Sequence, residues 1–144
     1  MSYDLIDLGS EEITAAVTDS VITEGVSAAG VSQGLIDQLG GVTAVTIQCA
    51  FVYGSGGTTC AVTVQTSFDQ GASWIDIARF DFTTATAKKV ANLSGLYSKA
   101  VAAVAALAAE GVTDGVLGDR FRAKVTSTGT YAGSTSVAVR MQPR

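Results

Sequence analysis

The chain has 144 residues and a formal net charge of −4; 47% of its residues are hydrophobic, 15% are charged, and histidine is absent. This length fits one domain with a sizeable core. The lack of histidine excludes Ser-His and Cys-His catalysis and histidine-ligated metal sites. Few charges and a positive mean hydropathy are typical of a subunit that buries much of its surface against neighbours.

The first 40 residues contain seven acidic residues and no lysine or arginine, and their apolar residues are thinly spread. We predict that residues 1–20 form an extended N-terminal arm, packed on the domain or on a neighbouring subunit, and that residues 21–144 form a single domain. The apolar side chains of the arm are candidate interface residues: Leu5, Ile6, Leu8 and Ile13. No apolar run reaches the roughly 18 residues of a membrane span, and the acidic N-terminus differs from the basic start of a signal peptide. We therefore expect no membrane partner and synthesis in a cytoplasm.

Most of the remaining chain shows period-two alternation and many β-branched residues, which together predict antiparallel strands. The predicted strands cover residues 31–37, 42–53, 58–66, 74–82, 120–126 and 135–141. Glycine-containing turns separate them, and the single proline is Pro143. Short strands at a spacing of roughly ten residues predict an all-β fold, an antiparallel β-sandwich of the jelly-roll-like kind.

The two cysteines flank a glycine-rich stretch at residues 54–57, which we predict to be a hairpin turn between the strands on either side. Alternation places Cys49 and Cys60 on the inward face of these strands. If the turn closes at Gly54 and Ser55, the two thiols lie opposite each other and a bridge is conceivable. We favour the alternative, two small buried thiols in a reducing compartment.

Residues 67–74, Ser-Phe-Asp-Gln-Gly-Ala-Ser-Trp, lie between two predicted strands. Asp69 can accept hydrogen bonds from nearby backbone N–H groups, and Gly71 can supply a positive φ. Trp74 is predicted to bury its ring over the turn. The pattern of Ser67, Asp69, Gly71 and Trp74 resembles the Asp-box hairpin of β-propeller glycosidases and of many small β-modules. In those folds the box is a structural staple, so its single occurrence implies a structural turn and no propeller.

Residues 99–110, Lys-Ala-Val-Ala-Ala-Val-Ala-Ala-Leu-Ala-Ala-Glu, support two interpretations. The alanine content and the helical spacing of Val101, Val104 and Leu107 favour a helix. The same side chains also alternate as in a strand, and the surrounding sequence is rich in predicted strands. We favour a strand here.

The acidic side chains offer little for catalysis or metal binding. Parity places Asp76 and Asp81 on opposite faces of their strand, so we expect no glycosidase pair and no catalytic residues. Asp69, Asp114 and Asp119 have the oxygen ligands that Ca²⁺ prefers, but they lack EF-hand spacing. We interpret them as turn residues and expect no metal and no cofactor.

Arg120, Arg122 and Lys124 alternate with inward apolar residues and therefore lie on the outward face of one predicted strand. Such a row could track phosphates, but the chain is acidic in total. We favour contact with an acidic protein surface, including the arm of a second copy, over contact with nucleic acid. The three cations are therefore candidate interface residues of a homo-oligomer.

Several segments together resemble small β-sandwich, jelly-roll-like virion proteins of tailed bacteriophages. The segments are residues 42–47, residues 62–69 with Trp74, and residues 117–125 followed by residues 129–133. This resemblance implies a non-enzymatic structural protein, a capsid decoration or cement subunit that binds the major capsid protein or other virion proteins. It also implies a location in the virion after assembly in the host cytoplasm.

Two other functions remain open. The same type of sandwich is used in proteins of the head–tail junction and in tail-associated modules that bind host carbohydrate. A carbohydrate-binding surface needs exposed aromatic rings in a row, and the candidates are Tyr53, Trp74, Tyr97 and Tyr131. Their spacing does not place three of them on one strand face.

Overall fold

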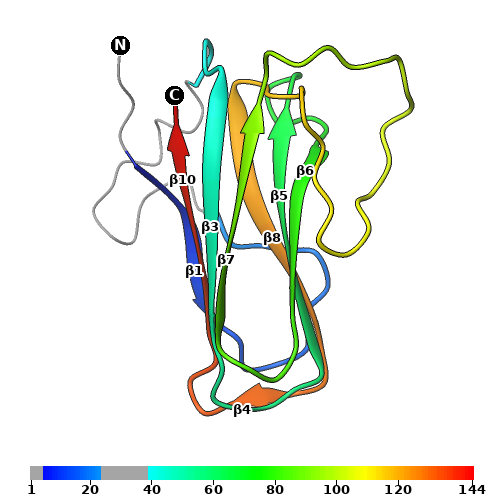
Figure 1. Cartoon of the computed structure of the whole chain (residues 1–144). Helices are drawn as coiled ribbons and strands as arrows, with labels where there is room; N and C mark the ends of the chain where they lie inside the picture. The colour runs from blue at the N-terminus through cyan, green and yellow to red at the C-terminus, as the bar shows by residue number, and fades with distance from the viewer. Residues whose placement is uncertain (1–4, 24–38) are drawn as a thin grey trace.

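The computed structural model describes residues 5–23 and 39–144, and within them the chain forms ten β-strands and no helix (Figure 1). The strand expected at residues 31–37 lies outside the described residues. No helix capable of crossing a bilayer is found in the part of the chain that the structure describes. The predicted all-β fold is confirmed.

Two four-stranded antiparallel sheets form the body of the molecule (Figure 1). Sheet A contains, in spatial order, β1 (Ile6–Glu12), β10 (Ser136–Pro143), β3 (Ala44–Val52) and β7 (Ala87–Ser94). Sheet B contains, in spatial order, β2 (Ser20–Val21), β8 (Arg120–Thr128), β5 (Thr59–Ser67) and β6 (Ile75–Phe82). Two short strands, β4 (Ser55–Gly56) and β9 (Tyr131–Ala132), pair with each other at the lower end in Figure 1.

The strand pairs are nested along the chain. β1 pairs with β10 and β2 with β8, while β3 pairs with β7 and β5 with β6. The pairs formed by the first and last strands thus enclose the pairs formed by the middle ones. This order is compatible with the predicted jelly-roll-like sandwich.

The core lies between the two sheets and is built from the inward side of each strand. The fully buried side chains of β3 are Val45, Ile47, Cys49 and Phe51, and those of sheet B include Val62, Val64, Phe121, Ala123 and Val125. Every one of them had the inward orientation that strand alternation predicts. Burying one face of each strand explains why the hydrophobic pattern of these segments has a period of two.

Aromatic rings join the sheets near the β4–β9 end. The Phe51 ring of sheet A stacks on the Phe82 ring of sheet B, with centroids 5.0 Å apart. The Tyr131 ring meets Phe51 edge-on at 5.7 Å, and the Tyr131 hydroxyl donates a hydrogen bond to the Thr83 carbonyl oxygen at 2.7 Å. Such ring pairs add about 0.5–1.5 kcal/mol to the free energy gained from burial alone.

The predicted N-terminal arm requires correction, because residues 6–12 form β1 inside sheet A. Ile6 and Leu8 are core residues, Ile13 is also buried, and only Leu5 of the four apolar candidates is exposed. Gly9 permits this packing: its φ is +128°, and a Cβ there would lie 2.3 Å from the Ile22 carbonyl oxygen. Ile6, Leu8 and Ile13 therefore stabilise the sandwich itself and are not available as a docking surface.

The predicted hairpin at residues 54–57 is also wrong, because β3 and β5 lie in different sheets. The glycine-rich stretch carries the chain from sheet A to sheet B and contains β4, which pairs with β9. Gly57 has a φ of +69°, and a Cβ there would lie 2.3 Å from the Tyr131 ring. The glycine is needed because the aromatic ring packs directly against the crossing backbone.

Strand β7 was not predicted from the sequence. The strand contains two consecutive lysines, Lys88 and Lys89, and Lys89 occupies an inward position. The apolar alternation that marks the other strands is therefore interrupted. Pairing with all of β3 from Ala44 to Phe51 nevertheless fixes β7 as the edge of sheet A. Tertiary pairing here overrides a weak local pattern.

Cys49 and Cys60 belong to opposite sheets, and both are buried free thiols. Burial raises the pKa of each thiol to about 12. Because the thiolate is the reactive species, we expect both cysteines to resist a thiol reagent at pH about 8 in the native protein and to react after unfolding in denaturant. Rapid labelling of the native protein would contradict this account of the core.

The revised role of β1 can be tested with two leucines of different exposure. Leu8→Ala should lower the free energy of unfolding by about 2–5 kcal/mol, because Leu8 is fully buried. Leu5→Ala should change it by less than about 0.5 kcal/mol, because Leu5 is exposed. Chemical denaturation measures both values, and a small effect of Leu8→Ala would restore the interpretation of an arm outside the core.

Candidate functional site

The turn between β5 and β6 is held by hydrogen bonds from Ser67 and Asp69. The Ser67 hydroxyl accepts a hydrogen bond from the Gly71 N–H at 2.9 Å and pairs with Asp69 Oδ1 at 2.8 Å. Asp69 Oδ1 also accepts the Ser73 N–H at 2.8 Å, and the Ser73 hydroxyl contacts the other carboxylate oxygen. Gly71 has a φ of +88°. The polar groups of the expected structural turn thus lie together in one compact network.

Trp74 lies at the end of this turn, with its ring half-buried rather than within the core. The indole Nε1–H donates a hydrogen bond to the Gly71 carbonyl oxygen at 3.1 Å. The Arg122 guanidinium carbon lies 4.4 Å from the ring centroid. The ring therefore closes the turn on one side and supports a cation on the other, which is a favourable arrangement for a cation–π contact.

A polar network extends from this turn across the outer face of sheet B, with Gln65 at its centre. The Gln65 side chain is 5% exposed. Its Nε2 donates to Asp76 Oδ1 at 2.7 Å, and its Oε1 accepts from Arg122 Nε at 2.8 Å. Asp76 Oδ2 accepts the Leu107 N–H at 3.2 Å. One glutamine thus connects β8, β5, β6 and, through Asp76, the alanine-rich segment (residues 99–110).

The expected separation of Asp76 and Asp81 on opposite faces is wrong, because β6 contains a bulge. The register with β5 passes from Val64 opposite Ala78 to Gln65 opposite Asp76, so Ile77 has no partner of its own. One extra residue reverses the inward–outward parity. Asp76 and Asp81 consequently both lie on the outer face of sheet B.

Both carboxylates of this face are engaged with neighbouring groups. Arg79 donates from Nε to Asp81 Oδ1 at 2.9 Å and from Nη2 to Asp81 Oδ2 at 3.0 Å. Its Nη1 donates to the Leu107 carbonyl oxygen at 3.0 Å. Asp76 and Arg79 therefore hold the backbone N–H and the C=O of Leu107 between them. The polar groups of this face thus fix the position of the alanine-rich segment at Leu107.

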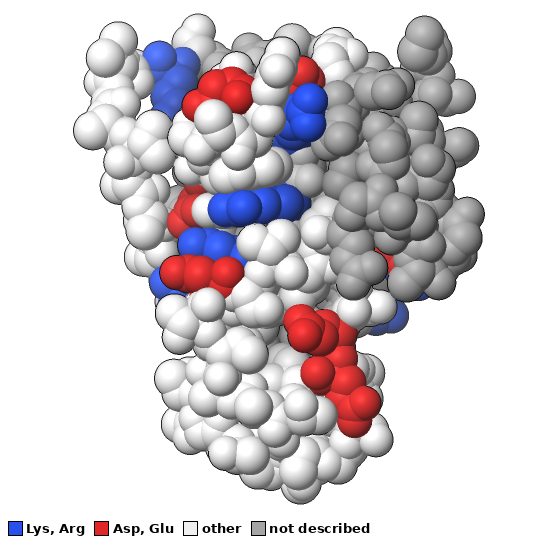
Figure 2. All heavy atoms as spheres, turned by 180° about the vertical axis from the view of Figure 1, so that it is seen from behind, with Lys and Arg blue, Asp and Glu red and all other residues white. Residues whose placement is uncertain are grey.

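The three candidate cations of β8 all lie close to other groups of the same chain. Arg122 is part of the network around Gln65, and Arg120 is half-buried. Lys124 Nζ lies 3.0 Å from Asp19 Oδ1, and this ammonium lowers the pKa of Asp19. Basic and acidic side chains lie close together over the upper and middle parts of the molecule in Figure 2, and acidic side chains continue down one side toward the uncharged bottom tip. The acidic partner expected from a second copy is present in the same chain.

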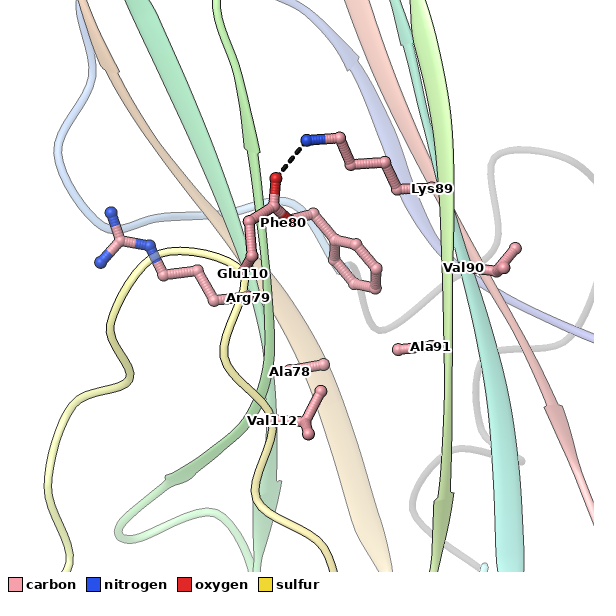
Figure 3. Close-up of a pocket in the computed structure, with 8 residues that line it drawn as sticks. All are labelled: Ala78, Arg79, Phe80, Lys89, Val90, Ala91, Glu110 and Val112. Atoms are coloured by element: carbon pink, nitrogen blue, oxygen red, sulfur yellow. Dashed lines mark hydrogen bonds and ion pairs between the residues drawn. The ribbon is translucent and has the colours of Figure 1, made fainter.

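A cavity of about 390 Å³ lies between the edges of the two sheets (Figure 3). It is lined by Ala78, Arg79, Phe80, Lys89, Val90, Ala91, Glu110 and Val112. Lys89 of β7 and Glu110 of the alanine-rich segment point toward each other and form an ion pair within this lining. Lys89 Nζ also donates to the Asp81 carbonyl oxygen at 2.6 Å. A half-exposed pair of this kind contributes about 0–1 kcal/mol, so its main effect is to join β7 to the segment that contains Glu110.

The alanine-rich segment is neither helix nor strand in the structure, apart from an isolated bridge just beyond it between Val112 and Ala78. Residues 107–113 run along β6: the Arg79 N–H donates to the Gly111 carbonyl oxygen at 2.9 Å, and the Thr113 N–H to that of Ile77 at 2.8 Å. Residues 99–106 stand away from the body and enclose a second cavity of about 480 Å³ against Ile75, Thr113 and Val116.

The described residues contain no group of three or more cysteine or acidic side chains placed to hold a metal ion. Asp69 is committed to its turn, and Asp114 Oδ1 accepts the Ser94 N–H at 2.7 Å. The aromatic candidates are also dispersed. Tyr53 and Tyr131 pack in the aromatic cluster at the β4–β9 end, Trp74 lies under Arg122, and Tyr97 is exposed.

Comparison of the chain with protein-family models, with curated proteins and with solved structures gives no match. The structural features above therefore carry the functional interpretation, together with the resemblance of the sequence segments.

The charge on Asp69 should stabilise the turn in a pH-dependent way. Hydrogen bonds from the Ser73 hydroxyl and N–H, and then from Ser67, lower the pKa of Asp69 in the folded state. Its stabilising effect is therefore complete above about pH 4, the ordinary range of Asp, and is lost as the pH falls through the lowered value. Asp69→Asn should accordingly lower Tm at pH about 7, and the difference from wild type should shrink at acidic pH. A difference independent of pH would show that the charge has no part in holding the turn.

Proposed function

We propose that this chain is a non-enzymatic virion structural protein of a tailed phage, a decoration or cement subunit that binds capsid proteins. The observation that carries the proposal is the exposure of large apolar side chains on a weakly charged surface. They include Leu5, Val52, Phe68, Val90, Leu96, Tyr97, Val101 and Val104. Four of them, Leu96, Tyr97, Val101 and Val104, lie within nine consecutive residues, and exposed apolar side chains that gather in one region mark a contact surface for another protein.

Two further features support a structural role. The carboxylates Asp76 and Asp81 are engaged by Gln65, Arg79 and the Leu107 N–H, which is the arrangement of a scaffold rather than of an acid–base pair. The nested strand pairing is compatible with a jelly roll, an architecture common among capsid proteins. Assignment to a tailed-phage particle rests on the resemblance of residues 42–47, 62–69 and 117–125.

One observation favours the alternative of a tail-associated module that binds host carbohydrate. Phe68 and Tyr97 are 62% and 66% exposed. Phe68 follows β5, and Tyr97 follows β7; both strands end at the upper end of the molecule in Figure 1. Exposed rings can stack on sugar faces, so this end is the candidate sugar-binding surface.

The location and copy number of the protein in particles test the proposal. Quantitative mass spectrometry of purified particles should find tens to hundreds of copies per capsid, as a lattice of decoration subunits requires. Purified protein added to particles that lack it should restore that number. A few copies per particle would contradict the decoration role and favour a junction or tail component. Glycan binding that Phe68→Ala and Tyr97→Ala abolish, without loss of incorporation, would support the carbohydrate-binding role instead.

A further inference from the structure

The two edge strands at the β6–β7 side of the sandwich are covered to different degrees. Along β6, residues 107–113 provide backbone hydrogen bonds to Ile77 and Arg79 and the bridge to Ala78. On β7, Ser94 alone has such partners among the described residues: its N–H donates to Asp114 Oδ1 at 2.7 Å, and its carbonyl oxygen accepts the Gly115 N–H at 2.9 Å. The structure therefore protects one edge and leaves most of the other open.

The orientation of Ser94 identifies the backbone groups that the open edge presents. Its N–H and C=O both point away from β3, and the direction of these groups alternates along an antiparallel strand. Lys88, Val90 and Asn92 consequently direct their N–H and C=O groups outward as well. No described residue pairs with these groups, and the Val90 side chain is 68% exposed. An edge of this kind is a template for a further strand.

The same molecule carries a segment that lacks backbone partners. Residues 99–106 make no hydrogen bond with any described residue. Val101 is fully exposed, and Val104 is 65% exposed. The segment begins at Lys99 and is otherwise uncharged. It is tied down at Leu107 by Asp76 and Arg79, which limits the entropy that it loses on docking.

We propose that the chain self-associates by strand addition, with residues 99–106 of one copy pairing with the open edge of β7 in a second copy. Donor and acceptor match in length, because both comprise eight residues. The segment leads into residues 107–113 along β6, and the edge of β7 lies across the cavity that Val90, Glu110 and Val112 line, so a two-fold axis lets two copies exchange segments reciprocally. Pairing satisfies the outward groups of β7, and alternation along the added strand places Val101 and Val104 on opposite faces of the extended sheet. This inference does not depend on the virion assignment.

The oligomeric state of the full chain tests the proposal. Sedimentation velocity over a range of concentrations should show a monomer–dimer equilibrium for the wild type. Ala103→Pro should weaken the dimer by about tenfold or more, because proline removes an N–H from the added strand. Ser98→Pro is the matched control, since Ser98 lies in the same loop but outside the segment, and it should leave the equilibrium unchanged. Circular dichroism should show the same β fold for all three proteins.

Cross-linking tests the register, which we propose to be antiparallel with Val101 of one copy opposite Val90 of the other. An oxidised mixture of the Val90→Cys and Val101→Cys variants should form a disulfide-linked dimer, whereas Val90→Cys mixed with Val52→Cys should not, because Val52 lies at the far end of β3. Equal cross-linking in both mixtures would overturn the proposed pairing. So would a wild-type protein that stays monomeric, or a dimer that Ala103→Pro leaves intact. A monomer whose binding to capsids requires residues 99–106 would assign the segment to a different partner.

Discussion

Pairing between the earliest and the latest strands is the constraint on which the structure depends. β1 pairs with β10 and β2 with β8, so each sheet is completed only when segments more than 100 residues apart meet. Opposite charges assist this meeting at one described point, where Asp19, just before β2, lies 3.0 Å from Lys124 of β8. The polarity that suggested contacts between copies is thus used within the fold. Contacts of such long range also imply slow folding relative to helical proteins of this size.

A single bulge in β6 determines the character of the outer face of sheet B. Because Ile77 is an extra residue, Asp76 lies on the same side as Arg79 and Asp81 and can meet Gln65. Asp76 and Arg79 together then hold the Leu107 backbone. The bulge therefore fixes Leu107, the point from which the exposed residues 99–106 leave the body of the molecule.

The two edges of the β6–β7 side serve different purposes. The chain covers β6 with its own residues 107–113, and the ion pair of Lys89 with Glu110 in the cavity lining joins this segment to β7. β7 keeps an open backbone edge, and residues 99–106 remain without partners in the described part of the chain. The proposed self-association would use this open edge and the uncovered apolar segment, on a chain of low charge and positive mean hydropathy.

The sequence by itself determined the all-β class, the inward faces of β3, β5, β8 and β10, and the polar groups of the turn around Asp69, because alternation and turn chemistry act between residues close in the chain. It did not determine which strands pair. The expected arm became β1, the expected hairpin became a crossing between sheets, β7 was missed, and residues 99–110 adopted neither regular structure. The network around Gln65 could not be predicted from the sequence either. It depends on the bulge at Ile77 and on a contact between Asp76 and Leu107, which are 31 residues apart. Only tertiary structure decides such features, because the free energy of pairing distant strands depends on the whole core and not on local propensity.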